Sequence, residues 1–193
     1  MKEKLLMILF VLILGSVLST ALVSVNAYTA PLIEKNKAMK LRVSILKAMG
    51  IAYFENKVDE TFFGNVITNE QGGREFYVAK TSRDIAFEIY GPGLWGPIHG
   101  IIALGPDLKT IKGITIIHQE ETPGLGGRIA EEDFLDRFEA KQVFPRPMIR
   151  PPGKASGNNE VDGITGATLS CKAFEEILNS EIKKYVSVIK ESK

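Results

Sequence analysis

The chain has 193 residues, with 24 basic and 23 acidic side chains and a formal net charge of +1. This length suits one folded domain with a small additional element, and the balanced charge gives no argument for nucleic acid as a partner. Cys171 is the only cysteine, which excludes an intramolecular disulfide and a CxxC-type metal or cluster site. With only two histidines, the sequence also gives no basis for predicting a metal centre.

The N-terminal run from Leu5 to Val25 contains no charged residue. At about 1.5 Å per residue, it is long enough to cross a hydrocarbon core of roughly 30 Å. A secretory signal peptide is the competing interpretation, with Lys2 and Lys4 as its basic start and residues 25–27 as its cleavage site. Because the run exceeds the usual signal-peptide core, we predict a retained transmembrane helix over 5–25.

The flanking charges predict the orientation of this helix. Two lysines precede it, and four basic residues follow it at positions 35, 37, 40 and 42. Because the nearest flank after it, residues 26–33, is uncharged, the local asymmetry favours residues 1–4 as a cytoplasmic end. The apolar spacing then predicts an amphipathic connecting helix within 26–56, with Pro31 in its first turn and Gly50 at its end. The remaining residues, 57–193, would form the folded domain on the extracytoplasmic side.

Short β-rich runs and amphipathic runs alternate in this domain. The pattern predicts an α+β fold, a mixed or antiparallel sheet with flanking helices. A helical turn capped by Asp59 should precede the sheet, and Pro145 to Asn159 is predicted to be irregular. The expected strands are 75–80, 85–90, 98–104 and 111–118, and the expected helices are 130–140 and 169–189.

A stretch of small and hydroxylated residues, Asp162-Gly163-Ile164-Thr165-Gly166-Ala167-Thr168-Leu169-Ser170, opens the last helix. Small side chains let backbone N–H groups approach an anion closely, and a helix N-terminus adds a favourable dipole. A phosphate-binding turn is therefore one interpretation. The other is that glycine and threonine here only cap the helix.

Two further loops could contact a ligand. The first, Glu121-Thr122-Pro123-Gly124-Leu125-Gly126, follows a strongly apolar strand, and its proline and glycines favour an exposed backbone of fixed shape. The second, 91–97, holds Leu94 and Trp95 between glycines and prolines. These two side chains could form the wall of a site for a flat aromatic ligand, or Trp95 could be a buried anchor of its loop.

The Thr165-Gly166-Ala167-Thr168 sequence after Asp162-Gly163 resembles the flavinylation motif of the FMN-binding subunits of the Rnf and Nqr respiratory complexes. The E-T-P-G-L-G loop resembles the isoalloxazine-binding loop of the same family. The resemblance runs from the N-terminal helix to the last helix. The short chain favours the Rnf branch, whereas the Gly93-Leu94-Trp95 element is nearer to the Nqr branch.

The resemblance implies that Thr168 carries FMN through a phosphoester bond, formed by a separate flavin transferase. Asp162, Thr165 and Ser170 would belong to the recognised motif or surround the phosphate. Glu121, Thr122 and Leu125 would line the flavin ring. The predicted cofactor site also includes small residues that let the backbone approach the cofactor, namely Gly124, Gly126, Gly163, Gly166 and Ala167.

The resemblance further implies a single-pass inner-membrane subunit, in contact with lipid and other membrane subunits, that relays electrons in a complex coupled to ion transport. No independent catalytic site is expected in such a subunit. Two alternatives remain at this point. One is a membrane-anchored scaffold without a cofactor, and the other is a phosphotransfer or nucleotide-binding enzyme that uses the Gly-Ala-Thr turn.

Overall fold

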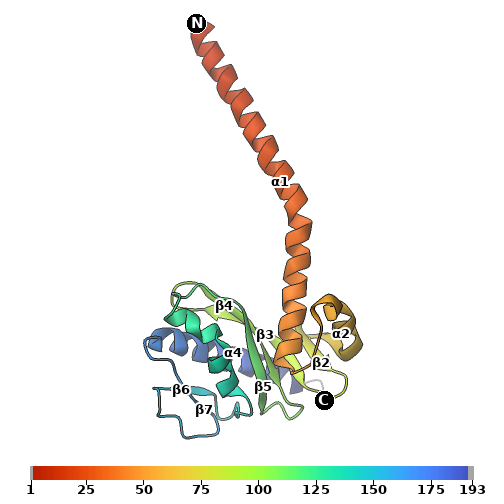
Figure 1. Ribbon diagram of the computed structural model, residues 1–193, viewed down its shortest axis with the longest axis vertical. Helices are drawn as coiled ribbons and strands as arrows, with labels where there is room; N and C mark the ends of the chain where they lie inside the picture. Colours follow the sequence, from red (N-terminus) through yellow and green to blue (C-terminus); the bar gives the residue numbers. More distant parts are fainter. Residues whose placement is uncertain (1, 191–193) are drawn as a thin grey trace. The chain divides into compact units, whose positions relative to one another are not determined.

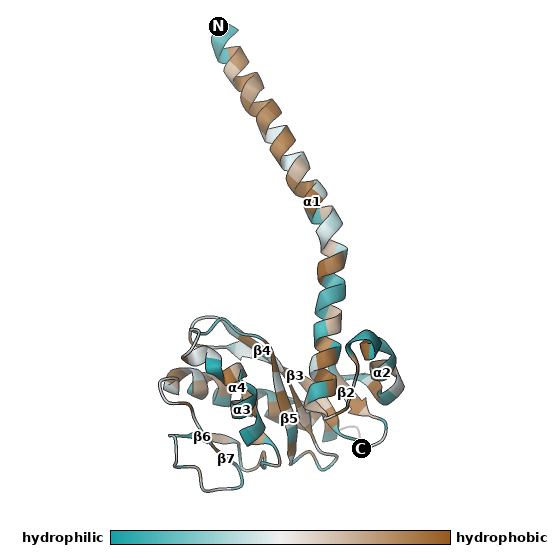
Figure 2. Ribbon diagram, in the orientation of Figure 1, coloured by the Kyte–Doolittle hydropathy of each residue, from teal (hydrophilic) through white to brown (hydrophobic). Residues whose placement is uncertain are grey.

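The computed structural model describes residues 2–190, and the chain divides into two compact units, Met1–Met39 and Lys40–Lys193. The first unit is helical throughout its described part, and it belongs to α1 (Lys2–Ala48). An 18-residue window of α1 has a mean hydropathy of 2.7 and is not buried by the rest of the protein. Figure 2 shows this part of the helix as an almost continuous hydrophobic run. By length and composition, α1 can cross a membrane.

The sequence predicts that a second helix starts near Pro31. The structure instead places Pro31 inside one continuous helix, α1. A proline removes a single backbone hydrogen bond, and the turns on either side keep the helix intact here. The helix ends at Ala48, where Gly50 has a φ of +66° and the N–H of Ile51 donates to the carbonyl of Leu46 at 2.9 Å. Glycine at this position is typical of a helix terminus. The helix therefore ends within two residues of Gly50, the predicted end.

The second unit is built on a five-stranded antiparallel sheet in which neighbours in sequence are neighbours in space. Four strands match the predicted runs, and the hairpin around residues 81–84 is confirmed. The edge strand β1 was missed because its polar sequence, VITNEQ, has little strand character; its six residues are ordered by pairing with β2. The strands are β1 (Val66–Gln71), β2 (Arg74–Ala79), β3 (Ile85–Pro92), β4 (Pro97–Leu104) and β5 (Ile111–His118).

One face of the sheet includes several alanines beside larger side chains and is covered by the end of α1 and by α2 (Val58–Asn65). Ala86 and Ala103 are fully buried there, in one cluster with Ile45 and Leu46 of α1. The predicted cap, Asp59, is instead inside α2 and bonds Arg42 of α1 at 2.5 Å. The residues of α1 from Lys40 onward belong to this compact unit.

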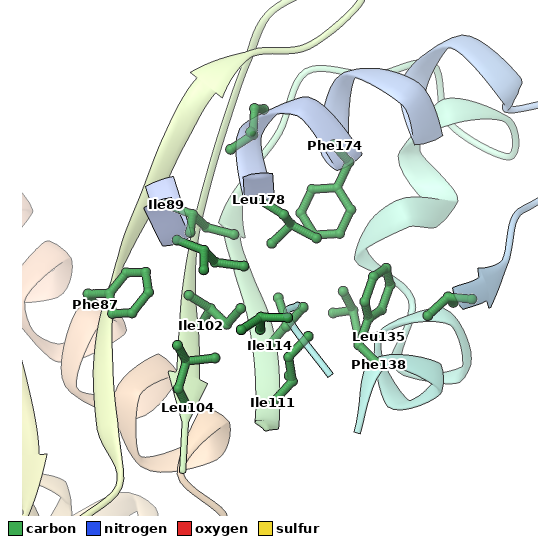
Figure 3. Close-up of a cluster of buried hydrophobic side chains, with 14 of the residues drawn as sticks. Phe87, Ile89, Ile102, Leu104, Ile111, Ile114, Leu135, Phe138, Phe174 and Leu178 are labelled. Carbon is green, nitrogen blue, oxygen red and sulfur yellow. The ribbon is translucent and has the colours of Figure 1, made fainter. Parts of the chain in front are cut away.

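The other face carries large side chains and is covered by α4 (Thr168–Lys190). Figure 3 shows Phe174 and Leu178 of α4 directed toward the strand residues. The ring of Tyr185 stacks on Phe87 of β3 with 4.3 Å between the centroids, an arrangement worth about 0.5–1.5 kcal/mol beyond its buried area. The apolar face predicted for the last helix is confirmed.

Shorter elements complete the domain. The single helix predicted over 130–140 is divided into η2 (Gly126–Ala130), α3 (Glu132–Leu135) and η3 (Asp136–Phe138). Its apolar residues are nevertheless buried as expected, and the ring of Phe138 meets that of Phe174 edge-on at 5.8 Å. The segment predicted to be irregular contains β6 (Met148–Arg150), which pairs in parallel with β7 (Glu160–Asp162) (Figure 1).

The end of α1 approaches the sheet closely at Gly113 of β5, where a Cβ atom would lie 2.6 Å from the carbonyl oxygen of Ala48. We expect Gly113→Ala to lower the free energy of unfolding by about 1–3 kcal/mol, because backbone would have to move. The control is Gly64→Ala in α2, where no atom lies within 4 Å and alanine should be neutral or stabilising by about 0.5–1 kcal/mol. Denaturant unfolding of both variants tests this, and equal stabilities would contradict the close packing.

Candidate functional site

Thr168 is the first residue of α4 and is exposed. The turn before it alternates between buried and exposed residues: Ile164 and Ala167 are buried, whereas Thr165 and Gly166 are exposed. The N–H of Ala167 donates to the carbonyl of Ile164 at 3.1 Å, and Gly166 has a φ of +83°, which glycine adopts without strain. The turn is thus fixed through its apolar residues and leaves the threonines on the surface.

A groove of about 330 Å³ borders Thr168. The first N–H groups of a helix have no acceptor within the helix, so the start of α4 offers donors and a positive dipole end beside the Thr168 hydroxyl. Arg146 and Lys172 line the same groove and add positive charge. Arg150 lines it as well but is paired with Glu160, and the one carboxylate of the lining, Glu175, accepts the N–H of Ile149. A phosphodiester on Thr168 therefore fits the chemistry of this groove. Neither Arg146 nor Lys172 was identified from sequence, because only the fold brings 146–152 beside α4.

The β6–β7 segment that forms one wall of the groove is held by two carboxylates. Asp162 accepts the N–H groups of Lys154 and Ala155, both at 2.9 Å. The Ala155 hydrogen bond is the main cause that lowers the pKa of Asp162. The N–H of the next residue, Gly163, donates to the carbonyl of Arg150 at 2.7 Å. Asp162 and Gly163 therefore shape the wall, and the Asp162 carboxylate is already bonded to backbone.

Glu121 is buried in the site, with only 4% of its surface exposed. Its Oε1 accepts the N–H of Leu94 at 2.6 Å and that of Trp95 at 3.2 Å. Its Oε2 accepts the hydroxyl of Ser170, in the first turn of α4, at 2.5 Å. Glu121 therefore joins the 93–96 loop, its own loop and the helix that begins with Thr168. The sequence interpretation placed Glu121 against a ligand and did not identify these partners.

The loop that follows Glu121 presents its tip to solvent. The Thr122 carbonyl accepts the N–H groups of Leu125 and Gly127, and Gly124 has a φ of +73°. Thr122 is exposed, as is 49% of Leu125, which lies beside Gly166 of the T-G-A-T turn.

The loop between β3 and β4 presents apolar side chains as well. Trp95 is 72% exposed and Leu94 is 47% exposed, so the interpretation of Trp95 as a buried anchor is wrong. Since the backbone of both residues is bonded to Glu121, the exposed side chains of Leu94, Trp95 and Leu125 lie on loops that meet at one place. An exposed indole with neighbouring leucines suits a flat aromatic ligand.

Comparison with known proteins shows which family this part of the chain resembles. Residues 93–183 match the FMN-binding domain. This match includes the 93–96 loop, the Glu121 loop and the T-G-A-T turn.

Curated relatives include the C subunit of the Na⁺-translocating NADH-quinone reductase from Haemophilus ducreyi, which is 37% identical over 110 residues, or 52% of this chain and 43% of that protein. The corresponding protein from Yersinia pestis is 37% identical over 49% of this chain and 38% of that protein. The chain thus spans about two fifths of the length of these relatives.

Solved structures extend the similarity to the fold. The crystal structure of the C subunit of this reductase from Parabacteroides distasonis has a TM-score of 0.71 and 25% identity, covering 80% of this chain and 94% of that one. Shewanella oneidensis NqrC has a TM-score of 0.66 and 18% identity, covers 74% of this chain and 90% of that one, and supports the fold alone. The predicted fold class is confirmed. The comparisons support the Rnf/Nqr family; within it, these relatives are Nqr proteins, and the Rnf branch is not supported.

The groove wall yields a prediction about acid stability. Glu160 accepts the N–H groups of Ser156 and Gly157 at 3.0 and 3.1 Å and an Arg150 N–H at 2.7 Å. These contacts, that of Ser156 first, lower the pKa of Glu160 from 4.5 to about 2. Since the folded protein holds the ionised form, this contribution to stability is present above pH 4.5 and is lost as the pH falls to about 2.

We therefore expect Glu160→Gln to flatten the dependence of unfolding free energy on pH between 4.5 and about 2. Denaturant unfolding at a series of pH values measures this. Glu139→Gln, at an exposed position, is the control and should keep the wild-type slope. Equal slopes for Glu160→Gln and wild type would show that the wall is not held by the ionised carboxylate.

Proposed function

We propose that this protein is a membrane-anchored flavoprotein subunit that carries FMN in a phosphoester bond to Thr168 and relays electrons within an Nqr-type ion-translocating complex. The observation that carries the proposal is the position of Thr168, an exposed hydroxyl at the N-terminus of α4 in a groove lined by three cationic side chains and one carboxylate. The match of residues 93–183 to the FMN-binding domain supports flavin as the group attached there.

The residues around Thr168 suit a phosphodiester, which keeps one negative charge. The dipole and free N–H groups at the start of α4 favour an anion, and Arg146 and Lys172 can offset its charge. When bound, FMN would supply one- and two-electron redox chemistry, and the protein would contribute binding and orientation. Leu94, Trp95 and Leu125 offer the apolar surface for the ring, on loops whose backbone is fixed by hydrogen bonds.

Covalent attachment requires a partner enzyme. A flavin transferase would join the Thr168 hydroxyl oxygen to the FMN phosphorus of FAD, with release of AMP and the hydroxyl proton. Thr165 and Gly166 are exposed beside Thr168 and are available for recognition by that enzyme. In this proposal, the chain needs no catalytic site of its own, and its other partners are the membrane subunits of the complex.

The proposal also assigns a location. The apolar part of α1 would cross the inner membrane once, with residues 1–4 in the cytoplasm and the flavin domain on the extracytoplasmic side. A covalent bond would keep the cofactor on the protein in a compartment where dissociated flavin would be lost.

Thr168→Val tests the attachment. When the chain is expressed together with an active flavin transferase, we expect wild type to gain the mass of FMN less water and to stay yellow after denaturation. Thr168→Val should lose both signals because it lacks the acceptor hydroxyl. Thr81→Val, in the exposed β2–β3 turn, is the control and should remain flavinylated. A colourless wild-type chain of unmodified mass, despite a proven transferase, would favour a scaffold without cofactor.

Cysteine labelling tests the orientation. Cys171 is buried, so background labelling should be low. A membrane-impermeant maleimide applied to spheroplasts should label Glu139→Cys, and it should label Glu3→Cys only after the membrane is opened. The reverse pattern would contradict the proposed topology. An intact mass that lacks the first residues would instead show that this segment is a cleaved signal peptide.

A further inference from the structure

A buried glutamate and a buried serine connect the parts of the candidate site. The exposed fractions of Glu121 and Ser170 are 4% and 2%, and the hydroxyl of Ser170 donates to Oε2 at 2.5 Å. Oε1 of the same carboxylate accepts the adjacent N–H groups of Leu94 and Trp95. These three hydrogen bonds connect the first turn of α4 to the loop that carries the exposed indole. We call Glu121 and Ser170 the buried pair.

The glycines of the two loops leave room for this pair. A Cβ atom on Gly126 would clash with the Ser170 hydroxyl and would lie 2.7 Å from Oε2 of Glu121. A Cβ atom on Gly93 would clash with Oε1 of Glu121. The spaces around both carboxylate oxygens are thus too small for a side chain at either position. The glycines at 93 and 126 are explained by the approach of backbone to Glu121 and do not require a ligand.

We propose that Glu121 and Ser170 are positioning residues, which set the place of the Trp95 loop relative to the N-terminus of α4. Neither residue needs to touch the cofactor for this role. Its importance for a flavin rests on the proposed function, because Thr168 would hold the phosphate two residues from Ser170 while Leu94 and Trp95 would meet the ring. The connection itself is a property of the chain without cofactor.

The chemistry of the pair predicts which substitutions preserve it. A buried carboxylate is tolerated only when donors satisfy it, and removing it leaves the donors without partners. Glutamine has the same shape, its carbonyl can accept the N–H groups of Leu94 and Trp95, and its NH₂ group can donate to the Ser170 oxygen. Glu121→Gln should therefore retain the connection, whereas Glu121→Ala and Ser170→Ala should break it.

Trp95 gives a direct measurement, because it is the only tryptophan in the chain. We would record time-resolved fluorescence anisotropy of the full chain in detergent, expressed without a flavin transferase. Glu121→Ala and Ser170→Ala should increase the amplitude of the fast, local depolarisation relative to wild type, whereas Glu121→Gln should keep the wild-type amplitude. Ser170→Ala keeps the test valid if Glu121→Ala does not fold, since it removes only one of the three hydrogen bonds.

Glu160→Ala is the matched control. Glu160 is also a buried carboxylate held by two backbone N–H groups and a side chain, but its partners lie in the β6–β7 segment. Its replacement should lower thermal stability and leave the Trp95 anisotropy unchanged. The proposal is overturned if every folded alanine variant at the pair keeps wild-type anisotropy, or if Glu160→Ala changes it equally. Since no flavin is present, the failure of this proposal is distinct from the failure of flavinylation at Thr168.

Discussion

The packing of α4 against the large-residue face of the sheet is the interaction on which the rest of the domain depends. Phe174, Leu178 and Tyr185 place the helix by filling the space above β3 and β4. The same helix begins with Thr168, so the apolar core also decides where the exposed hydroxyl stands. Because the helix is rigid, its packing in the core also fixes the position of Thr168 at the surface. A site at a helix start is better fixed than one on a loop alone.

The two faces of the sheet pack against different helices. The face toward the end of α1 is lined by Ala86, Ala103 and Gly113, and this lets the helix backbone come close. The end of α1 is therefore part of the domain core, although the same helix contains the apolar run that can cross a membrane.

At the candidate site, each of three carboxylates accepts hydrogen bonds from N–H or O–H donors of the chain. Glu121 is buried among N–H and hydroxyl donors, and Asp162 and Glu160 bind backbone N–H groups of a segment with little regular structure. Hydrogen bonds to buried charged groups are strong in a low-dielectric environment and define a single geometry. Loops rich in glycine and proline, which have few apolar contacts, acquire fixed shapes in this way. The exposed Trp95 and Leu125 are thus presented to solvent on ordered backbone.

The sequence by itself determined the elements with strong periodicity. The apolar run of α1, the four apolar strands and the amphipathic α4 were predictable because each reflects local spacing of apolar residues. The T-G-A-T turn and the E-T-P-G-L-G loop were identifiable from their residues. Local pattern also predicted a helix over 130–140, although not its division into three short elements.

Only the tertiary structure decided what depends on residues distant in sequence. Strand β1 and the β6–β7 pair form through pairing with partners, and their own sequences carry weak signals. Arg146 and Lys172 reach one groove because the chain returns across α4. Glu121 became a link between two loops and a helix because folding buried its carboxylate among donors from positions 94, 95 and 170. The spacing of apolar residues in the sequence indicates which face of a helix or strand is buried. Which N–H and O–H donors surround a buried carboxylate depends on how the helices, strands and loops pack together.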